Sequence, residues 1–132
     1  MLRRLAWSSV PSPSFSAARL NEIVAPSRRN NERNHLSGML LFTGAHFLGI
    51  LEGDERDLDN LWLRLERDKR HNGLIRIGDE ACGERWFPDW MMAYTDHAVV
   101  GSQIETLRAP MAGIASKWME LIRPIMLRAD SM

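Results

Sequence analysis

Two apolar runs of strand length, separated by a short loop, constrain the fold of this chain most. Residues 38–42 and 47–51 flank a loop that contains one glycine, an arrangement typical of a β-hairpin. Acidic residues follow Glu52 and Gly53 and suit the first turn of a helix. Apolar side chains then recur at i, i+3, i+4 and i+7, at Leu58, Leu61, Trp62 and Leu65. The pattern predicts a hairpin on which an amphipathic helix packs.

The flanking segments extend this unit on both sides. Residues 2–9 indicate a first strand, and a helix is expected to begin near Ser14 or Ser16 and to bend or restart at Pro26. We expect the second helix to continue to Gly73, followed by two more strands at residues 74–77 and 86–92. The order βαββαββ predicts an α/β sandwich in which one sheet carries two helices on one face.

The last third of the chain has a different pattern. We expect residues 1–95 to form the domain and residues 96–132 to form a helical cap or an oligomerisation segment. A helical apolar stripe, interrupted by Pro124, supports that expectation: Ile114, Trp118, Leu121, Ile122, Ile125 and Met126. Eight methionines and five tryptophans are more large apolar groups than one core of this size accommodates. The composition therefore predicts a homo-oligomer that uses this stripe or the exposed side of the sheet.

Composition excludes several classes of function. The 17 basic and 17 acidic residues balance, so no global field draws the chain onto nucleic acid or an anionic membrane. No run approaches the roughly 20 apolar residues that cross a bilayer, and the single cysteine, Cys82, cannot form an internal disulfide. We therefore expect a cytoplasmic protein without membrane contact. The four histidines lack metal-ligand spacing. The sequence has neither a nucleophile and base at motif spacing nor a phosphate-binding loop, so we do not expect an enzyme.

Five spaced motifs carry a family resemblance. In chain order they are RRLAWSS, SRRNNERNHLSGMLLF, FLGILEG, RDKRH and RWFPDWMM, and together they extend from residue 3 to residue 92. In order and spacing they resemble the BLUF domain, the flavin-binding module of blue-light sensors. The resemblance implies a ferredoxin-like fold and an FAD slot.

Two positions depart from the family pattern. The family's strand-one tyrosine falls on Trp7, and its strand-three glutamine falls on Gly49; these are the two photochemical residues of the family. A shifted alignment cannot recover them, because the only tyrosine and the only glutamine, Tyr94 and Gln103, lie beyond the last motif. Because glycine in a strand is unfavourable, Gly49 predicts that a bulky group, with Trp7 the candidate, approaches its backbone.

The resemblance also implies which residues form the walls of the slot. Asn31, with Ser27 and Asn30, is expected to bond the edge of the flavin ring. Arg64, Asp68 and His71, which we place on one side of the second helix at i, i+4 and i+7, are expected to form the opposite wall. The alternative for Arg64 and Asp68 is an exposed ion pair that contributes only about 0.3 to 0.5 kcal/mol.

The leading hypothesis is a stand-alone, degenerate BLUF-like regulatory or interaction module that is insensitive to light, with weak or absent FAD binding and an unknown protein partner. The first alternative is a flavoprotein that binds FAD with altered photochemistry. The second is an adaptor that binds nucleic acid through Arg28, Arg29 and Arg33, although cations near a helix C-terminus ordinarily complement the helix dipole.

Overall fold

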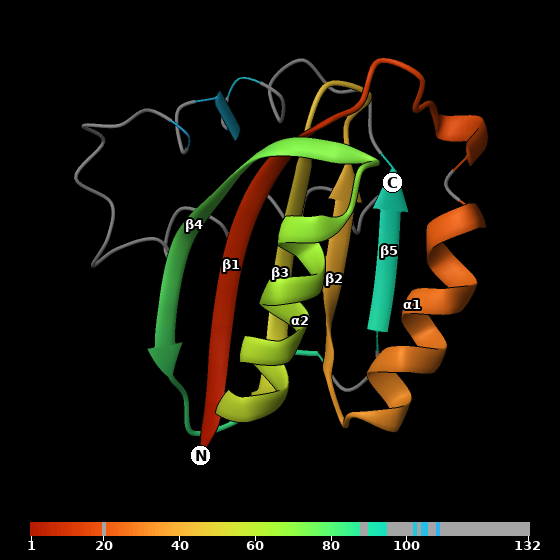
Figure 1. Cartoon of the computed structure of the whole chain (residues 1–132). Helices are drawn as coiled ribbons and strands as arrows, with labels where there is room; N and C mark the ends of the chain where they lie inside the picture. Colours follow the sequence, from red (N-terminus) through yellow and green to blue (C-terminus); the bar gives the residue numbers. More distant parts are fainter. Residues whose placement is uncertain (20, 88–89, 95–101, 103, 106–107, 109–132) are drawn as a thin grey trace.

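A twisted five-stranded sheet organises the chain in the computed structural model, which describes residues 1–19, 21–87, 90–94, 102, 104–105 and 108 (Figure 1). The strand order across the sheet is β4-β1-β3-β2-β5. Neighbours are antiparallel except β2 and β5, which are parallel. The elements are β1 (Leu2–Pro11), the short 3-10 helix η1 (Ala17–Arg19), α1 (Asn21–Arg33), β2 (Ser37–Phe42), β3 (Phe47–Asp54), α2 (Glu55–Arg67), β4 (His71–Ala81) and β5 (Trp90–Tyr94).

The predicted order βαββαββ, with both helices on one face of the sheet, is confirmed (Figure 1). The hairpin forms as expected: Thr43 Oγ1 accepts hydrogen bonds from the backbone N–H groups of Ala45 and His46, and Gly44 adopts a φ of 90° that favours glycine. Asp54 caps the N-terminus of α2 by accepting a 3.1 Å hydrogen bond from the backbone N–H of Arg56.

Three predicted boundaries are wrong. The second helix ends at Arg67 instead of reaching Gly73, because Asp68 leaves the helix with a ψ of 119°, and His71 already begins β4. The first helix begins at Asn21 and continues past Pro26 to Arg33. The last strand begins at Trp90 instead of residue 86. The predicted cap at residues 96–132 and its apolar stripe lie almost entirely outside the described residues.

The helix-facing side of the sheet holds the main apolar core. Because side chains alternate across a strand, every second residue of β1, β2 and β3 points toward the helices. Those residues join Phe15, Leu36 and Leu58 in one cluster, to which the sheet contributes Leu5, Trp7, Leu40, Phe42, Phe47 and Leu51. The cluster forms the floor on which α2 rests.

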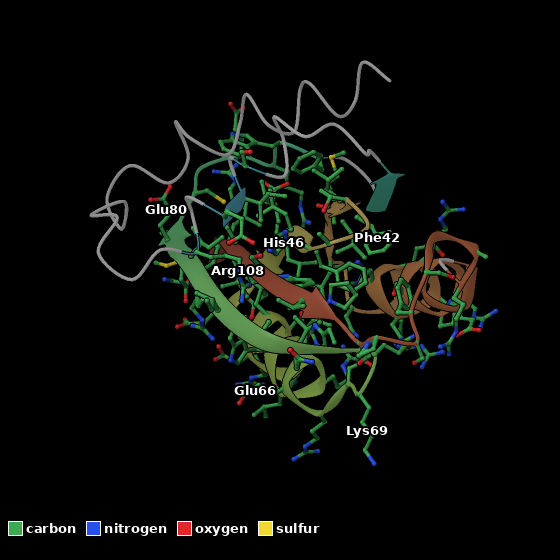
Figure 2. All side chains as sticks on the ribbon, turned by 90° about the horizontal axis from the view of Figure 1, so that it is seen from above. Phe42, His46, Glu66, Lys69, Glu80 and Arg108 are labelled. Carbon is green, nitrogen blue, oxygen red and sulfur yellow. The ribbon has the colours of Figure 1, made fainter. Side chains whose placement is uncertain are left out.

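The opposite face is covered in part by residues from beyond β5. Figure 2 shows Arg108 and His46 on the side of the sheet away from Glu66 of α2. Arg108 donates to the Ser8 hydroxyl at 3.1 Å and to the Gly73 carbonyl at 2.9 Å, while Glu105 lies 2.6 Å from His46 Nε2. Ile104 is fully buried between these contacts. Arg108 therefore contacts β1 and β4, and Glu105 contacts the hairpin loop.

A buried ion pair fixes this second face. Arg4 and Glu52, which are 3% and 0% exposed, form a 2.8 Å salt bridge between β1 and β3. The Glu52 carboxylate also accepts hydrogen bonds from the backbone N–H groups of Trp86 and Phe87, and the Arg4 guanidinium lies 3.9 Å from the centre of the Trp86 ring. One carboxylate thus joins two strands to the segment that leads into β5.

We expect Glu52→Gln to destabilise the fold strongly, because it leaves the buried Arg4 charge without its counterion. Breaking one partner of such a pair costs about 3 to 5 kcal/mol, which urea unfolding would measure. Glu22→Gln is the matched control, since it breaks an ion pair with Arg19 on the surface and should change stability little. Equal effects of the two substitutions would contradict a structural role for the buried pair.

Candidate functional site: a slot between the two helices

A cavity of about 200 Å³ lies between α1, α2 and the sheet. The structure brings all six predicted wall residues to its lining: Ser27, Asn30, Asn31, Arg64, Asp68 and His71. The apolar floor between the walls comes from the sheet and includes Trp7, Leu40 and Phe47. Side chains that are up to 64 positions apart in the chain, from Trp7 to His71, therefore meet at one slot.

The α1 wall of the slot consists of polar side chains that have no hydrogen-bond partner among the described residues. Asn31 is only 3% exposed, and its side-chain amide forms no hydrogen bond with any residue that the structure describes. Its backbone is ordered by a 2.7 Å hydrogen bond from the Leu36 N–H to the Asn31 carbonyl. Ser27 and Asn30, which are half-buried, likewise have no side-chain partner within the described part of the chain. Three hydrogen-bonding side chains on this wall are available to a ligand.

The wall from the end of α2 is held by an ion pair that the sequence analysis did not predict. Asp68 pairs with Arg70 instead of Arg64: Arg70 Nη2 lies 2.6 Å from Asp68 Oδ2, and the Arg70 backbone N–H donates to Asp68 Oδ1 at 3.0 Å. Burial raises the pKa of Asp68, but these hydrogen bonds outweigh burial and leave the pKa below its ordinary value. The carboxylate therefore stays ionised at neutral pH, and its stabilising effect is lost only in acid, as the pH falls through that lowered pKa.

Arg64 is left at the rim of the slot. It is exposed, and among the residues that the structure describes none forms a hydrogen bond or ion pair with its guanidinium. The alternative of an exposed Arg64–Asp68 pair is therefore wrong, because Asp68 is already committed to Arg70. Arg70 lies in the motif RDKRH, but the sequence does not indicate that it pairs with Asp68, which caps the end of α2 two residues earlier.

His71 is locked by two short hydrogen bonds. Its Nε2 lies 2.6 Å from the Leu65 carbonyl, which can only accept, so Nε2 carries a proton. Its Nδ1 lies 2.6 Å from Ser9 Oγ and accepts a hydrogen bond from that hydroxyl. Both ring nitrogens are thus used inside the protein, and His71 contributes shape to the slot instead of a hydrogen bond to a ligand.

Trp7, on the floor of the slot, packs against Gly49 of the neighbouring strand. They lie directly opposite each other in the β1–β3 register, and Trp7 is 4% exposed. A Cβ added to Gly49 would lie 2.4 to 2.6 Å from three indole atoms, Cε2, Nε1 and Cζ2. A Cβ atom essentially never lies within 3.0 Å of a non-bonded heavy atom. The prediction that a bulky group approaches the Gly49 backbone is confirmed, and that group is Trp7.

The indole N–H is left without a partner. Trp7 Nε1 is buried and has no hydrogen-bond acceptor among the described residues, although a buried Trp N–H usually finds one. The ring is held instead by its contact with Gly49 and by an edge contact with His71, whose ring centre is 6.0 Å away. Shape, not hydrogen bonding, positions Trp7.

Comparison with known proteins shows the family. A family model described as BLUF, sensors of blue-light using FAD, matches residues 2–93. The chain belongs to the BLUF family. It is similar to BlrB, a BLUF protein whose dark-state structure has a TM-score of 0.73 at 25% identity, over 99% of this chain and 97% of that one.

Two curated relatives are much longer proteins. The photoactivated adenylate cyclase subunit alpha of Euglena gracilis is 27% identical over 122 residues, which cover 89% of this chain and 12% of that protein. The blue light- and temperature-regulated antirepressor BluF of Escherichia coli (strain K12) is 29% identical over 77 residues, which cover 58% of this chain and 19% of that protein. This BLUF chain thus spans less than a fifth of either relative. Among its described helices, none is long and apolar enough to span a bilayer.

The residues present fit a flavin only in part. The amides and hydroxyl of the α1 wall suit the carbonyl and imide edge of a flavin ring. The floor suits it less well, because Trp7 is buried there with its indole against the Gly49 backbone. The cavity of about 200 Å³ is also smaller than the 300 to 1,000 Å³ typical of pockets for drug-sized ligands.

We expect Gly49→Ala to destabilise this BLUF chain, although alanine is normally better than glycine in a strand by about 0.5 to 1 kcal/mol. The added methyl overlaps the indole, and overpacking of this kind costs about 1 to 3 kcal/mol, so the clash wins. Urea unfolding measures the difference.

Two further variants make that prediction specific. Gly83→Ala is the matched control, because a Cβ at Gly83 meets nothing within 4 Å. Trp7→Tyr combined with Gly49→Ala should be less destabilised than the sum of the single changes, with a coupling of about 0.5 to 3 kcal/mol. Additive effects would show that the indole does not exclude a side chain at position 49.

Proposed function

We propose that this BLUF chain is a regulatory or interaction module that has lost the family's light response and that binds FAD weakly or not at all. The observation that carries the proposal is the indole of Trp7 lying where a side chain at position 49 would have to be. In the family the light response needs a tyrosine that donates an electron and a glutamine whose hydrogen bonds rearrange. Glycine has no hydrogen bond to rearrange.

The energetics support weak flavin binding. Loss of the glutamine removes two or so hydrogen bonds to the ring, each worth about 0.5 to 1.5 kcal/mol. That loss corresponds to roughly one to two orders of magnitude in affinity. The small cavity acts in the same direction, since a ring that needs more room must displace Trp7 from its contact with Gly49 and His71.

One observation favours the second candidate, a flavoprotein with altered photochemistry. Asn31, Asn30 and Ser27 line the slot without partners among the described residues, which is the arrangement that a bound ring edge would satisfy. This candidate predicts a flavin absorption band in purified protein, whereas the leading proposal predicts a weak band or none.

The activity and partners of the longer relatives cannot be assigned to this chain from the similarity, because the chain matches only a small part of each relative. The cyclase relative is matched over 12% of its length, so its catalytic activity is not assigned here. We propose that the chain acts by contact, as a homo-oligomer or with another protein. Exposed Leu63 on α2 and Ile75 on β4 are apolar groups available to such contacts.

We expect blue light to leave the absorption spectrum unchanged, whether FAD copurifies or is added. Neither Trp7→Tyr nor Gly49→Gln alone should restore a red shift: the first lacks the glutamine, and the second places a side chain against the indole. Difference absorption spectroscopy on purified protein is the measurement.

The double variant, Trp7→Tyr with Gly49→Gln, is the informative partner in this experiment. It should bind FAD more tightly than the unmodified chain, because it restores the missing hydrogen bonds and removes the indole from the floor. A reversible red shift in the unmodified protein would contradict the proposed loss of the light response. A double variant without FAD binding would show that the slot differs from the family's beyond these two positions.

A further inference from the structure

β4 is the longest described strand and lies at one edge of the sheet, beside β1 (Figure 1). It has 11 residues, and within the described part of the chain it pairs with a strand on one side only. The outer side of such a strand presents backbone N–H and C=O groups that can pair with a strand of another chain. Natural edge strands are usually short or protected, so a long edge is a candidate for a contact between molecules.

A β-bulge in β4 brings two opposite charges to one face. Two adjacent residues of β1 pair with Gly78 and Arg76, so Ile77 is the extra residue. In a regular strand, residues three positions apart point to opposite faces. Arg76 and Asp79 instead share a face, since their partners in β1 are two positions apart, and Arg76 Nη1 lies 3.0 Å from Asp79 Oδ2.

These two charges lie on the helix-facing side of the sheet and are partly exposed. The Arg76 guanidinium lies 4.3 Å from the centre of the Trp62 ring of α2, and Asp79 also pairs with Arg3 at 2.8 Å. The side chains of Arg76 and Asp79 are 38% and 29% exposed. Charges of one sign on an edge would repel a second copy of the strand, but these charges have opposite signs.

The order of residues along the outer edge is complementary to itself. When two copies of β4 lie antiparallel about a twofold axis between Ile77 and Gly78, Arg76 of each copy faces Asp79 of the other. Ile77 then faces Gly78, which has no side chain to obstruct it. A shift by one residue places Arg76 opposite Gly78 or opposite Glu80, which points to the other face of the sheet. The charges therefore select one register.

We propose that two copies of this BLUF chain pair through residues 74–81 of β4 and form one sheet that continues across both copies. The charges of Arg76 and Asp79 from the two copies then alternate in sign around the twofold axis. The contact is isologous, so each edge covers the other and the assembly closes as a dimer. The inference rests on the proposed function, in which the chain acts by contact, and it identifies the partner as a second copy.

Sedimentation velocity of the purified chain and of two charge-reversal variants tests this proposal. We expect the unmodified chain to sediment as a dimer at about 50 µM. Arg76→Asp places acidic side chains opposite each other across the contact, and Asp79→Arg places basic ones there. Each variant alone should therefore dimerise at least roughly tenfold more weakly. An equimolar mixture of the two should dimerise again, because every contact in the heterodimer joins opposite charges.

The mixture separates a contact between copies from a role inside one chain. Both reversals break the ion pair within the chain, so loss of that pair alone would leave the mixture as weak as the single variants. Arg67→Asp is the matched control, because it makes the same charge change at an exposed position on α2 and should leave the dimer intact. A monomeric unmodified chain, or a mixture no tighter than its components, would overturn the proposal.

Ile75 gives an independent test of the register at a position where substitution leaves the core unchanged. It is 36% exposed, and in the proposed register it faces Glu80 of the second copy on the same side of the sheet. Ile75→Lys should therefore dimerise about tenfold more tightly than Ile75→Glu, since only the first places opposite charges across the contact. Equal association of these two variants would overturn the register and with it the proposal.

The outcomes distinguish this inference from the proposed function. A reversible red shift under blue light would contradict the proposed loss of the light response, whether or not the chain dimerises. A dimer that the β4 variants leave unchanged would overturn the assignment of the contact to β4, while the proposal that the chain acts as a homo-oligomer would stand.

Discussion

The contact between the Trp7 indole and the bare backbone of Gly49 determines the shape of the whole site. The two residues oppose each other across β1 and β3, and any side chain at position 49 would overlap the indole. Since adjacent residues of a strand point to opposite faces, the register that places Trp7 over Gly49 also places Ser8 on the other side of the sheet. The position of the indole, and with it the shape of the slot floor, therefore depends on the absence of a side chain at position 49.

That register also links the slot to the far face of the sheet. Ser8 follows Trp7 directly, donates to the Phe47 carbonyl at 2.8 Å and accepts a hydrogen bond from Arg108. Phe47 in turn lines the slot with its ring. The Arg108 guanidinium contacts the Ser8 side chain, one residue from Trp7 in β1. Trp7 and Phe47, which line the slot on one side of the sheet, are thus connected through Ser8 to a residue beyond β5 on the other side.

The sequence predicted the elements better than their ends. The apolar periodicity correctly predicted the hairpin and α2. Such a pattern reports burial of one helix face, and Leu58, Leu61 and Leu65 do contact the core on the sheet. It misplaced the end of α2 because Asp68 and His71 continue a helical spacing by coincidence, and because Gly73, with a φ of 61°, lies in β4 instead of ending the helix. The slot walls came from the family resemblance. The Asp68–Arg70 pair and the Ser9–His71 hydrogen bond were not predicted. The first depends on how the helix ends, and the second joins residues 62 positions apart in the sequence, so neither leaves a local sequence pattern.

The polar wall of the slot distinguishes a remodelled binding site from one that has simply closed. If Trp7 only filled a disused cavity, the remaining space would be most stable with apolar walls, since an unpaired buried amide is costly. The cavity instead keeps about 200 Å³ of space and is lined by Asn31, Asn30 and Ser27, whose side chains have no hydrogen-bond partner among the described residues. Stability alone does not explain this polar wall, because apolar side chains facing the core would contribute more to stability. A site that sacrifices stability to keep hydrogen-bonding groups is typical of binding, and the space that Trp7 leaves free sets the size of what can be bound.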